Sequence, residues 1–379
     1  MIQFVSKKRP SIKHLINLSA LLGFAGLVGC ATVSGVSSTP NSDSFNWVSS
    51  EPLISSPADG TNKIYGVKDP SIVSFNGKYH VFMTLAGDKG WSLAYTSFRD
   101  WKEAPNAPIV PLDNSPIGPG YRAAPQIFYF APQKLWYLVY QGGPPLYSTS
   151  DDISNPHSWS APKPFFNTTP DILKQPSYDT WLDFWNICDD KNCYLFFTGD
   201  NGDFYRAETT LAQFPNGFHN TTRVMTGNKD DIFEASNTYK LEGTNTYLTL
   251  VEAIGKKGRY FRAWTSNNLA GEWKPIPTSP MNTFADSDNV TFSGAVWAEG
   301  VSHGEMVRSS IDQTLAIDPC KPLQFLYQGL DTTQSKTTDY IKLPYKLALI
   351  TAVGPNPVSN LCKVKNPARM EGNLSVEKH

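Results

Sequence analysis

A strand–turn–strand pattern recurs along this chain and constrains its fold more than any other feature of the sequence. The first copy comprises residues 69–75, a turn at 76–78 that contains Asn-Gly, and a second strand that begins at Tyr79. Asn-Gly between short apolar runs is a strong hairpin signal. Four further copies follow, with second strands that begin at Tyr137, Tyr194, Tyr247 and Phe325. Repeats of roughly 50 to 80 residues, each with room for four strands, predict an all-β fold, a five-bladed β-propeller.

The first strand of each blade lines the central channel of a propeller, so equivalent positions converge at one mouth of that channel. When the copies are aligned, these first strands start at Asp69, Ala124, Asp183, Glu234 and His303. Taken singly, each acid could be a solvated turn residue or a strand cap, but their shared register argues for a common site. Two carboxyl groups across a cleft are the minimum apparatus for glycoside hydrolysis, because one donates a proton while the other activates water or attacks the sugar.

Composition and missing motifs narrow the classes of function. The formal net charge is -1 and no basic run follows the N-terminus, which argues against a nucleic-acid partner. The sequence also lacks Gly-x-Ser-x-Gly, His-Glu-x-x-His and a phosphate-binding glycine loop. Aromatic residues make up 13% of the chain, so we expect many rings to be partly exposed and available for stacking on sugars.

The first 30 residues are typical of an export signal, with a basic start, an apolar stretch and then Gly29 and Cys30. Residues 27–30 resemble a bacterial lipobox, which implies cleavage before Cys30 and acylation of its thiol; the alternative is an ordinary signal with a chance cysteine. Residues 31–44 are small and polar, which predicts a flexible tether. We expect the propeller over residues 45–365 and a flexible tail over 366–379. The protein should thus be exported and lipid-anchored. We expect it at the outer membrane or cell surface, because Ala31 is not the acidic residue that commonly retains lipoproteins at the inner membrane.

The remaining cysteines, Cys188, Cys193, Cys320 and Cys362, are even in number and fit an oxidising compartment. Three pairings are open to them, of which 188 with 193 and 320 with 362 is favoured. The four residues between Cys188 and Cys193 are typical of a turn, so a hairpin closed by its own disulfide is expected there. A zinc site is the weaker alternative, because no histidine lies nearby.

Several stretches together resemble glycoside hydrolase family 62. They are Lys-Asp-Pro-Ser-Ile-Val at 68–73, Ala-Pro-Gln-Ile-Phe-Tyr-Phe-Ala-Pro at 124–132, Asp-Phe-Trp-Asn-Ile-Cys-Asp-Asp at 183–190, Phe-Glu-Ala-Ser-Asn-Thr-Tyr-Lys-Leu at 233–241, Arg-Tyr-Phe-Arg-Ala-Trp at 259–264, Ser-His-Gly-Glu at 302–305 and Leu-Gln-Phe-Leu-Tyr-Gln-Gly at 323–329. The resemblance covers roughly residues 60 to 355. It implies a five-bladed propeller that releases α-L-arabinofuranosyl side chains from arabinoxylan with inversion, with the related family 43 as the nearest alternative.

The resemblance also implies roles for individual residues. Asp69 matches the general base, Glu234 the general acid, and Asp183 the residue that modulates the pKa of the acid. Lys68 matches a pocket lysine beside the base, although a surface lysine on a turn is the alternative. Tyr340 matches a tyrosine that lines the sugar pocket or the chain cleft.

His303 matches an axial histidine near a bound calcium ion, which would be structural or electrostatic because the hydrolysis needs no cofactor. A hydrogen-bonded channel histidine is the equal alternative. The sequence departs from the family pattern at Ile341, where an Asn is often found, and at Gly142, where a Trp is often found. Both changes remove groups that could contact the arabinose or the flanking xylose units. The sequence therefore predicts the type of reaction better than the substrate preference.

Two other functions stay open at this stage. One is a family 43 activity such as β-xylosidase or endo-arabinanase. The other is a non-catalytic surface propeller that binds glycans, which loss of the base, acid or modulator would favour; all three are present. The expected partners are the arabinoxylan substrate and, through the lipid anchor only, a membrane, and we expect a monomer.

Overall fold

The computed structural model describes residues 43–57, 63–174, 181–278, 280, 282–331, 333, 337 and 339–362. Cys30, the predicted signal and tail, and the predicted tether up to residue 42 lie outside the described residues. Phe45, where the propeller was expected to begin, is already buried.

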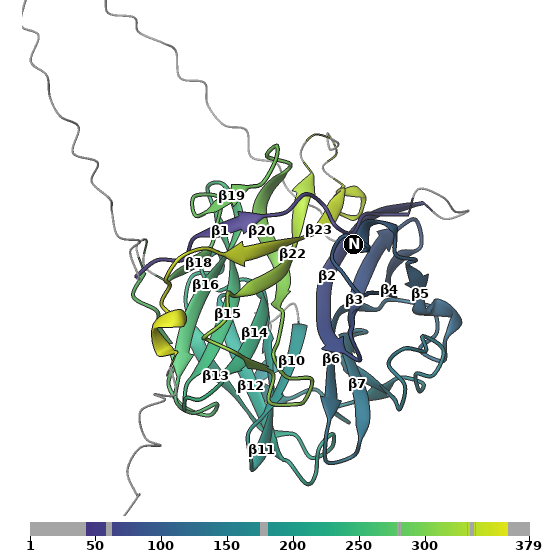
Figure 1. Ribbon diagram of the computed structural model, residues 1–379. Helices are drawn as coiled ribbons and strands as arrows, with labels where there is room; N and C mark the ends of the chain where they lie inside the picture. The colour runs from purple at the N-terminus through teal and green to yellow at the C-terminus, as the bar shows by residue number, and fades with distance from the viewer. Residues whose placement is uncertain are drawn as a thin grey trace, which may run out of the picture. The chain divides into compact units, whose positions relative to one another are not determined.

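The described strands form five separate sheets, which are the blades of the predicted β-propeller (Figure 1). Each of the first three blades is a four-stranded antiparallel meander of strands that are consecutive in the sequence, with short turns between the inner three strands and a longer connection to the outermost one. Blade 1 contains β2 (Ile64–Phe75), β3 (Lys78–Gly87), β4 (Gly90–Phe98) and β5 (Val110–Pro111); blade 2 contains β6 (Ala123–Phe130), β7 (Leu135–Gln141), β8 (Pro145–Ser150) and β9 (Lys163–Pro164); blade 3 contains β10 (Leu182–Cys188), β11 (Asn192–Thr198), β12 (Asp203–Thr210) and β13 (His219–Thr226).

Blades 4 and 5 contain more strands than the four expected from the repeat. Blade 4 contains β14 (Glu234–Leu241), β15 (Tyr247–Gly255), β16 (Gly258–Ser266) and β17 (Lys274–Pro275), with β18 (Thr283–Ala285) on β16 and β21 (Ala316–Ile317) on β14. Blade 5 contains β20 (Ala298–Met306), β22 (Gln324–Asp331), β23 (Tyr345–Ala352), β1 (Trp47–Ser49) and β19 (Val290–Phe292).

The ring of blades is closed by the N-terminal strand. β1 pairs antiparallel with β23, near the C-terminal end, and parallel with β19 (Figure 1). Trp47 secures this joint, because its indole nitrogen donates to the Phe284 carbonyl at 2.7 Å and its ring packs edge-on against Phe284. The two ends of the propeller are therefore joined by sheet hydrogen bonds and by a buried aromatic cluster.

Aromatic rings fill the spaces between blades. Trp136 of blade 2 packs against Phe75 of blade 1 at 5.1 Å, and similar pairs join blades 3 and 4 and blades 4 and 5. Most rings are buried in this way, but many remain partly exposed, as the composition predicts, among them Trp91, Trp101 and Phe233. Among the aromatic residues that the structure describes, only Tyr121 and Tyr340 are largely exposed, at 41% and 42%.

The innermost strand of every blade begins with an irregularity. The pairing register shifts after Lys68, Ala123, Leu182, Glu234 and Ser302. In four blades the next residue has a left-handed backbone, with φ of 49° at Asp69, 48° at Ala124, 55° at Asp183 and 53° at Ala235. Such a conformation costs a non-glycine residue about 1–3 kcal/mol, and bulges of this kind commonly redirect side chains at functional sites.

The structure pairs Cys188 with Cys193 and Cys320 with Cys362, the pairing that the sequence favours. The first disulfide closes the β10–β11 hairpin, where the two cysteines face each other in register. Both sulfurs are used in this disulfide, so neither is available as a zinc ligand and the zinc alternative is wrong.

The helical elements of the described chain are short 3-10 turns: η1 (Ala104–Asn106), η2 (Leu112–Asn114), η3 (Asp171–Leu173), η4 (Tyr340–Lys342) and η5 (Ser359–Leu361). None of the turns in the residues covered by the structure has the length and apolar composition of a membrane-spanning helix.

Candidate active site

The backbone at the start of each inner strand is fixed in a way that repeats around the ring. In each blade the main-chain N–H of one residue donates to a side chain of the preceding blade, which joins neighbouring blades at the channel mouth. The pairs are Asp69 N to Gln328 Oε1 (2.8 Å), Ala124 N to Thr84 Oγ1 (2.9 Å), Asp183 N to Gln141 Oε1 (3.0 Å), Ala235 N to Asp183 Oδ2 (2.8 Å) and His303 N to Glu252 Oε2 (2.8 Å).

This repeat corrects one element of the sequence alignment. Asp69, Ala124, Asp183 and His303 occupy equivalent positions, as expected, but the equivalent residue in blade 4 is Ala235. Glu234 lies one position earlier, in register with Lys68. The bulge separates the two positions, and an alignment of strand-forming residues contains no signal for that offset.

A cavity of about 270 Å³, here called the acidic pocket, lies at this mouth of the channel. It contains all six residues that the sequence assigned to catalysis, sugar binding or metal: Lys68, Asp69, Asp183, Glu234, His303 and Tyr340. Its other lining residues are Trp91, Tyr121, Ala123, Gln141, Leu182, Asp200, Phe233 and Arg259.

Several pocket residues that the sequence did not single out come from the connections between second and third strands. Asp200 follows β11, Arg259 is the second residue of β16 and Trp91 is the second residue of β4. Tyr340, which the resemblance did assign to the pocket, lies in the corresponding β22–β23 connection. Of Asp200, Arg259 and Trp91, only Arg259 carried a signal in the sequence, because it opens one of the motifs that resemble family 62.

Asp69 is buried beside Lys68 and the imidazole of His303. His303 Nδ1 lies 3.3 Å from Asp69 Oδ1, and Lys68 is the adjacent residue. Burial alone would raise the pKa of the Asp69 carboxyl, but the charges of Lys68 and His303 outweigh it and hold that pKa below its usual value. Asp69 is therefore an ionised carboxylate near neutral pH, as a general base must be.

Lys68 is held in place by Tyr340. Its ammonium donates to the Tyr340 hydroxyl at 2.8 Å and lies 4.4 Å from the centre of the ring. Burial would lower the pKa of Lys68, yet Asp69 and Tyr340 raise it above the usual value, so the side chain keeps its charge. Lys68 is only 5% exposed, which excludes the surface-turn alternative.

Glu234 also lines the pocket and contacts the Arg259 guanidinium. The same Arg259 nitrogen is 2.8 Å from Glu252 Oε1, so one positive charge is shared by two carboxyl groups. Glu252 is fully buried, and burial raises its pKa while Arg259 opposes the shift. Arg259 thus connects Glu234 to the interior of blade 4.

Asp183 and Asp200 extend this acidic side of the pocket. Burial raises the pKa of Asp183 well above its usual value, and the charges of Glu234 and Asp69 raise it further. Burial, Glu234 and Asp183 raise the pKa of Asp200 to about 8. Asp183 Oδ2 also accepts from the N–H of Ala235, next to Glu234, and lies 3.9 Å from His303 Nδ1. Like charges in a buried site cannot all ionise cheaply, so Asp183 and Asp200 favour their protonated forms.

The Nδ1 atom of His303 lies close to a carboxyl oxygen of both Asp69 and Asp183. Within the described residues, no group of three or more His, Cys, Asp or Glu side chains has the arrangement of a metal site. Oxygen ligands of the kind that calcium prefers are nevertheless present on the inner strands, where the side-chain oxygens of Asn186 and Asn237 are buried and have no hydrogen-bond partner in the described part of the chain.

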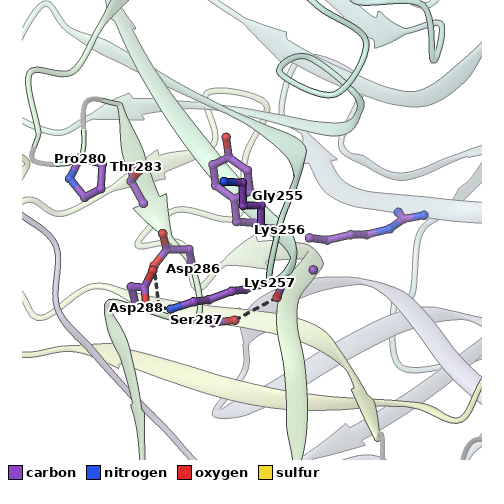
Figure 2. Close-up of a pocket in the computed structure, with 11 residues that line it drawn as sticks. Gly255, Lys256, Lys257, Pro280, Thr283, Asp286, Ser287 and Asp288 are labelled. Carbon is purple, nitrogen blue, oxygen red and sulfur yellow. Dashed lines mark hydrogen bonds and ion pairs between the residues drawn. The ribbon is translucent and has the colours of Figure 1, made fainter. Parts of the chain in front are cut away.

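A second hollow, of about 350 Å³, shares Arg259 with the acidic pocket. Figure 2 shows it between the β15–β16 turn and residues 286–288. Lys257 forms an ion pair with Asp288, and Ser287 donates to the Lys257 carbonyl at 3.3 Å (Figure 2). These polar groups are paired with one another, so the acidic pocket is the candidate for chemistry.

Comparisons with known proteins agree with this site. The model of glycosyl hydrolase family 62 matches residues 46–351. Alpha-L-arabinofuranosidase C of Cellvibrio japonicus (strain Ueda107) is 39% identical over 367 residues, which cover 92% of this chain and 56% of that protein. The chain therefore spans little more than half the length of this curated relative.

Solved structures resemble the propeller closely. The catalytic domain of a family 62 α-L-arabinofuranosidase from Coprinopsis cinerea is 48% identical with a TM-score of 0.78, covering 82% of this chain and 98% of that chain. An α-L-arabinofuranosidase from Podospora anserina, in complex with cellotriose, is 46% identical with the same TM-score and coverage. The resemblance seen in the sequence motifs is confirmed: the chain belongs to glycosyl hydrolase family 62.

Proposed function

We propose that this protein is an inverting α-L-arabinofuranosidase that releases arabinofuranosyl side chains from arabinoxylan. The observation that carries the proposal is that Asp69 and Glu234 line one acidic pocket in different surroundings. Lys68 and His303 hold the pKa of Asp69 below its usual value, while Glu234 shares the pocket with Asp183 and Asp200, whose pKa values are raised by burial and by the charge of Glu234. Glycoside hydrolysis requires an ionised base and a protonated acid, the roles that we propose for Asp69 and Glu234.

In the proposed reaction, the Asp69 carboxylate takes a proton from a water molecule as that water attacks the anomeric carbon of the arabinosyl unit. The bond from this carbon to the xylosyl oxygen breaks, and Glu234 donates its proton to the leaving oxygen. Asp183 Oδ2 accepts from the N–H of Ala235, the residue next to Glu234, and this bond fixes Asp183 beside the acid that we propose it modulates.

The size of the acidic pocket supports removal of a side chain. Its volume of about 270 Å³ is below the roughly 300–1,000 Å³ of sites for drug-sized ligands, so it suits a single sugar ring. A main chain would have to lie outside it. This favours arabinofuranosidase over the endo-arabinanase alternative from family 43.

Product analysis tests the proposal. The purified protein should release arabinose from arabinoxylan, and Asp69→Asn and Glu234→Gln should each reduce the rate at least about 1,000-fold, since each removes a group required in the transition state. Asp171→Asn, at an exposed carboxylate outside the pocket, is the matched control. Xylose or arabino-oligosaccharides as main products would favour the family 43 alternative, and binding without any release would favour the glycan-binding alternative.

Calcium binding is a further part of the proposal. The ion would lie near His303, and the unpartnered amide oxygens of Asn186 and Asn237 on the inner strands are candidate oxygen ligands; its positive charge would stabilise the ionised carboxylates near the channel. Added calcium should raise the melting temperature of the metal-free protein, and Asn237→Leu should reduce that rise. An unchanged melting temperature over millimolar calcium would argue for a purely hydrogen-bonded His303.

We also propose that the protein is exported and anchored by a lipid on Cys30, at the outer membrane in a two-membrane cell, and acts as a monomer. The basic and apolar segments before Cys30 support export. Cys30→Ala should move activity from the membrane fraction to the soluble fraction without changing the specific activity. Unchanged membrane association of this variant would contradict the lipid anchor, and size-exclusion chromatography with light scattering would detect an oligomer.

A further inference from the structure

Gln141 at the end of β7 connects the backbone of one pocket acid to a tyrosine at the pocket mouth. Its Oε1 accepts from the main-chain N–H of Asp183 at 3.0 Å, and its Nε2 donates to the Tyr121 hydroxyl at 2.6 Å. A main-chain N–H can only donate, so the atom that faces Asp183 must be the amide oxygen. The amide orientation is therefore fixed by its own hydrogen bonds.

The equivalent residue of blade 5 is used in the same way. Gln328 Oε1 accepts from Asp69 N–H, and its Nε2 donates to the Ser302 hydroxyl at 2.9 Å. Two glutamines at equivalent positions thus each receive a backbone N–H and each donate to a hydroxyl. The difference lies in the hydroxyl, because Ser302 is buried while Tyr121 is 41% exposed and lines the acidic pocket.

The donation from Gln141 determines what the Tyr121 hydroxyl can do. Its oxygen acts as the acceptor toward Gln141, so the phenolic proton must point elsewhere. No described residue accepts that proton in the structure. Burial, with a contribution from the charge of Asp183, raises the pKa of Tyr121 to about 12, so the proton stays on the oxygen over the working pH range.

The Tyr121 ring is also held in place. It packs edge-on against Trp91, with the ring centres 6.0 Å apart, and both residues line the acidic pocket. The hydroxyl is therefore fixed from two directions, by Gln141 at the oxygen and by Trp91 at the ring. A fixed donor at a pocket costs little entropy when it binds a ligand.

We propose that Gln141 is a positioning residue that makes Tyr121 a hydrogen-bond donor to one hydroxyl of the bound furanose ring, and that this bond contributes to selection of the sugar. The inference rests on the proposed function for the identity of the sugar. Neither residue was assigned a role by the sequence motifs. The donors Lys68 and Arg259 of this pocket are charged and already paired, so a fixed neutral donor distinguishes a sugar that offers a correctly placed acceptor oxygen.

Deoxy substrates test the bond directly. The wild type and Tyr121→Phe are compared on 4-nitrophenyl α-L-arabinofuranoside and on its 2-, 3- and 5-deoxy analogues. Tyr121→Phe should lower kcat/KM roughly 10-fold on the parent substrate, the cost of one unmade hydrogen bond. On the one analogue that lacks the partner hydroxyl, wild type and variant should have equal kcat/KM. Tyr129→Phe, on β6 outside the pocket, is the matched control.

A double-mutant cycle tests the part played by Gln141. Gln141→Met removes both hydrogen bonds of the amide. The bond to the Asp183 N–H is lost whether residue 121 is Tyr or Phe. With Tyr121 present the substitution should cost several-fold more in kcat/KM than in the Tyr121→Phe background, because only then does it also release the phenolic hydroxyl.

An equal loss for Tyr121→Phe on every analogue, or no loss on the parent substrate, would overturn the inference, as would a strictly multiplicative cycle. If the wild type releases no 4-nitrophenol at all, the proposed function fails instead. Calorimetric binding of methyl α-L-arabinofuranoside and its deoxy forms then tests the same bond, with the same pattern of losses expected and a uniform loss counting against it.

Discussion

Replacement of Lys68 by Met should change the pH profile of the enzyme, because Lys68 is the strongest charge that keeps Asp69 ionised. Methionine keeps the length and apolar character of the side chain and removes only the ammonium. Asp69 stays buried, and burial raises a carboxyl pKa when no opposite charge compensates. His303, 3.3 Å away, remains as a weaker partner.

The magnitude follows from the surroundings of Asp69. An adjacent cation typically lowers the pKa of an Asp by 1–3, so removal of Lys68, with His303 retained, should move the acid limb of the kcat/KM profile to higher pH by about 1 to 2. The sign follows from the role of the base: it works only when ionised, and in the wild type it stays ionised to below its usual pKa. A change of one in the pKa of Asp69 corresponds to about 1.4 kcal/mol. At a pH about one below its raised pKa, the variant should therefore have about one tenth of the kcat/KM that it reaches on its own high-pH plateau.

The assay is kcat/KM for 4-nitrophenyl α-L-arabinofuranoside from pH 3 to pH 8. Lys63→Met is a matched control, because Lys63 also lies over a tyrosine ring, that of Tyr65, but does not line the acidic pocket. Circular dichroism at each pH separates unfolding from titration. A uniform loss of activity with an unmoved acid limb would refute the account of Asp69 and leave Lys68 with a role in sugar binding only.

Two other predictions concern the propeller itself. Removal of the Cys320–Cys362 disulfide by double Ala substitution should lower the free energy of unfolding by about 4 kcal/mol, against about 2 kcal/mol for the Cys188–Cys193 disulfide, because the first closes a loop with a sequence separation of 42 and the second one of 5. Equal losses in urea denaturation would contradict the loop-entropy argument. Trp47→Ala should cost about 3–5 kcal/mol, since it removes a buried indole from the joint that closes the ring, and a loss below about 1 kcal/mol would show that β1 contributes little to closure.

The blades could be predicted from the sequence because their signals are local. Alternating strands and turns such as Asn76-Gly77 occur within one repeat, and the five repeats fix the number of blades. The position of Glu234 was predicted one residue out of register, because the backbone bulge at Ala235 leaves no mark in a hydrophobic pattern. Glu234 nevertheless lines the acidic pocket, as predicted.

The rest of the pocket depends on contacts between blades. Gln141 looks like an ordinary strand residue, and its function appears only when Asp183 of the next blade and Tyr121 lie on either side of it. Asp200 looks like a turn residue between two glycine-containing segments. Aromatic composition correctly predicts that many rings stay partly exposed, but it does not say which rings the blades bury and which line the pocket.

The stereochemistry of the first product tests the central claim most directly, because it depends on where Asp69 and Glu234 lie relative to the sugar. Inverting enzymes separate the two carboxyl groups by roughly 6.5–9.5 Å to admit a water molecule, whereas retaining enzymes hold them about 5–5.5 Å apart. Proton NMR recorded within the first turnovers of an α-linked substrate should show β-L-arabinofuranose forming first, before mutarotation. A first-formed α-anomer would contradict the assignment of Asp69 as a base that activates water.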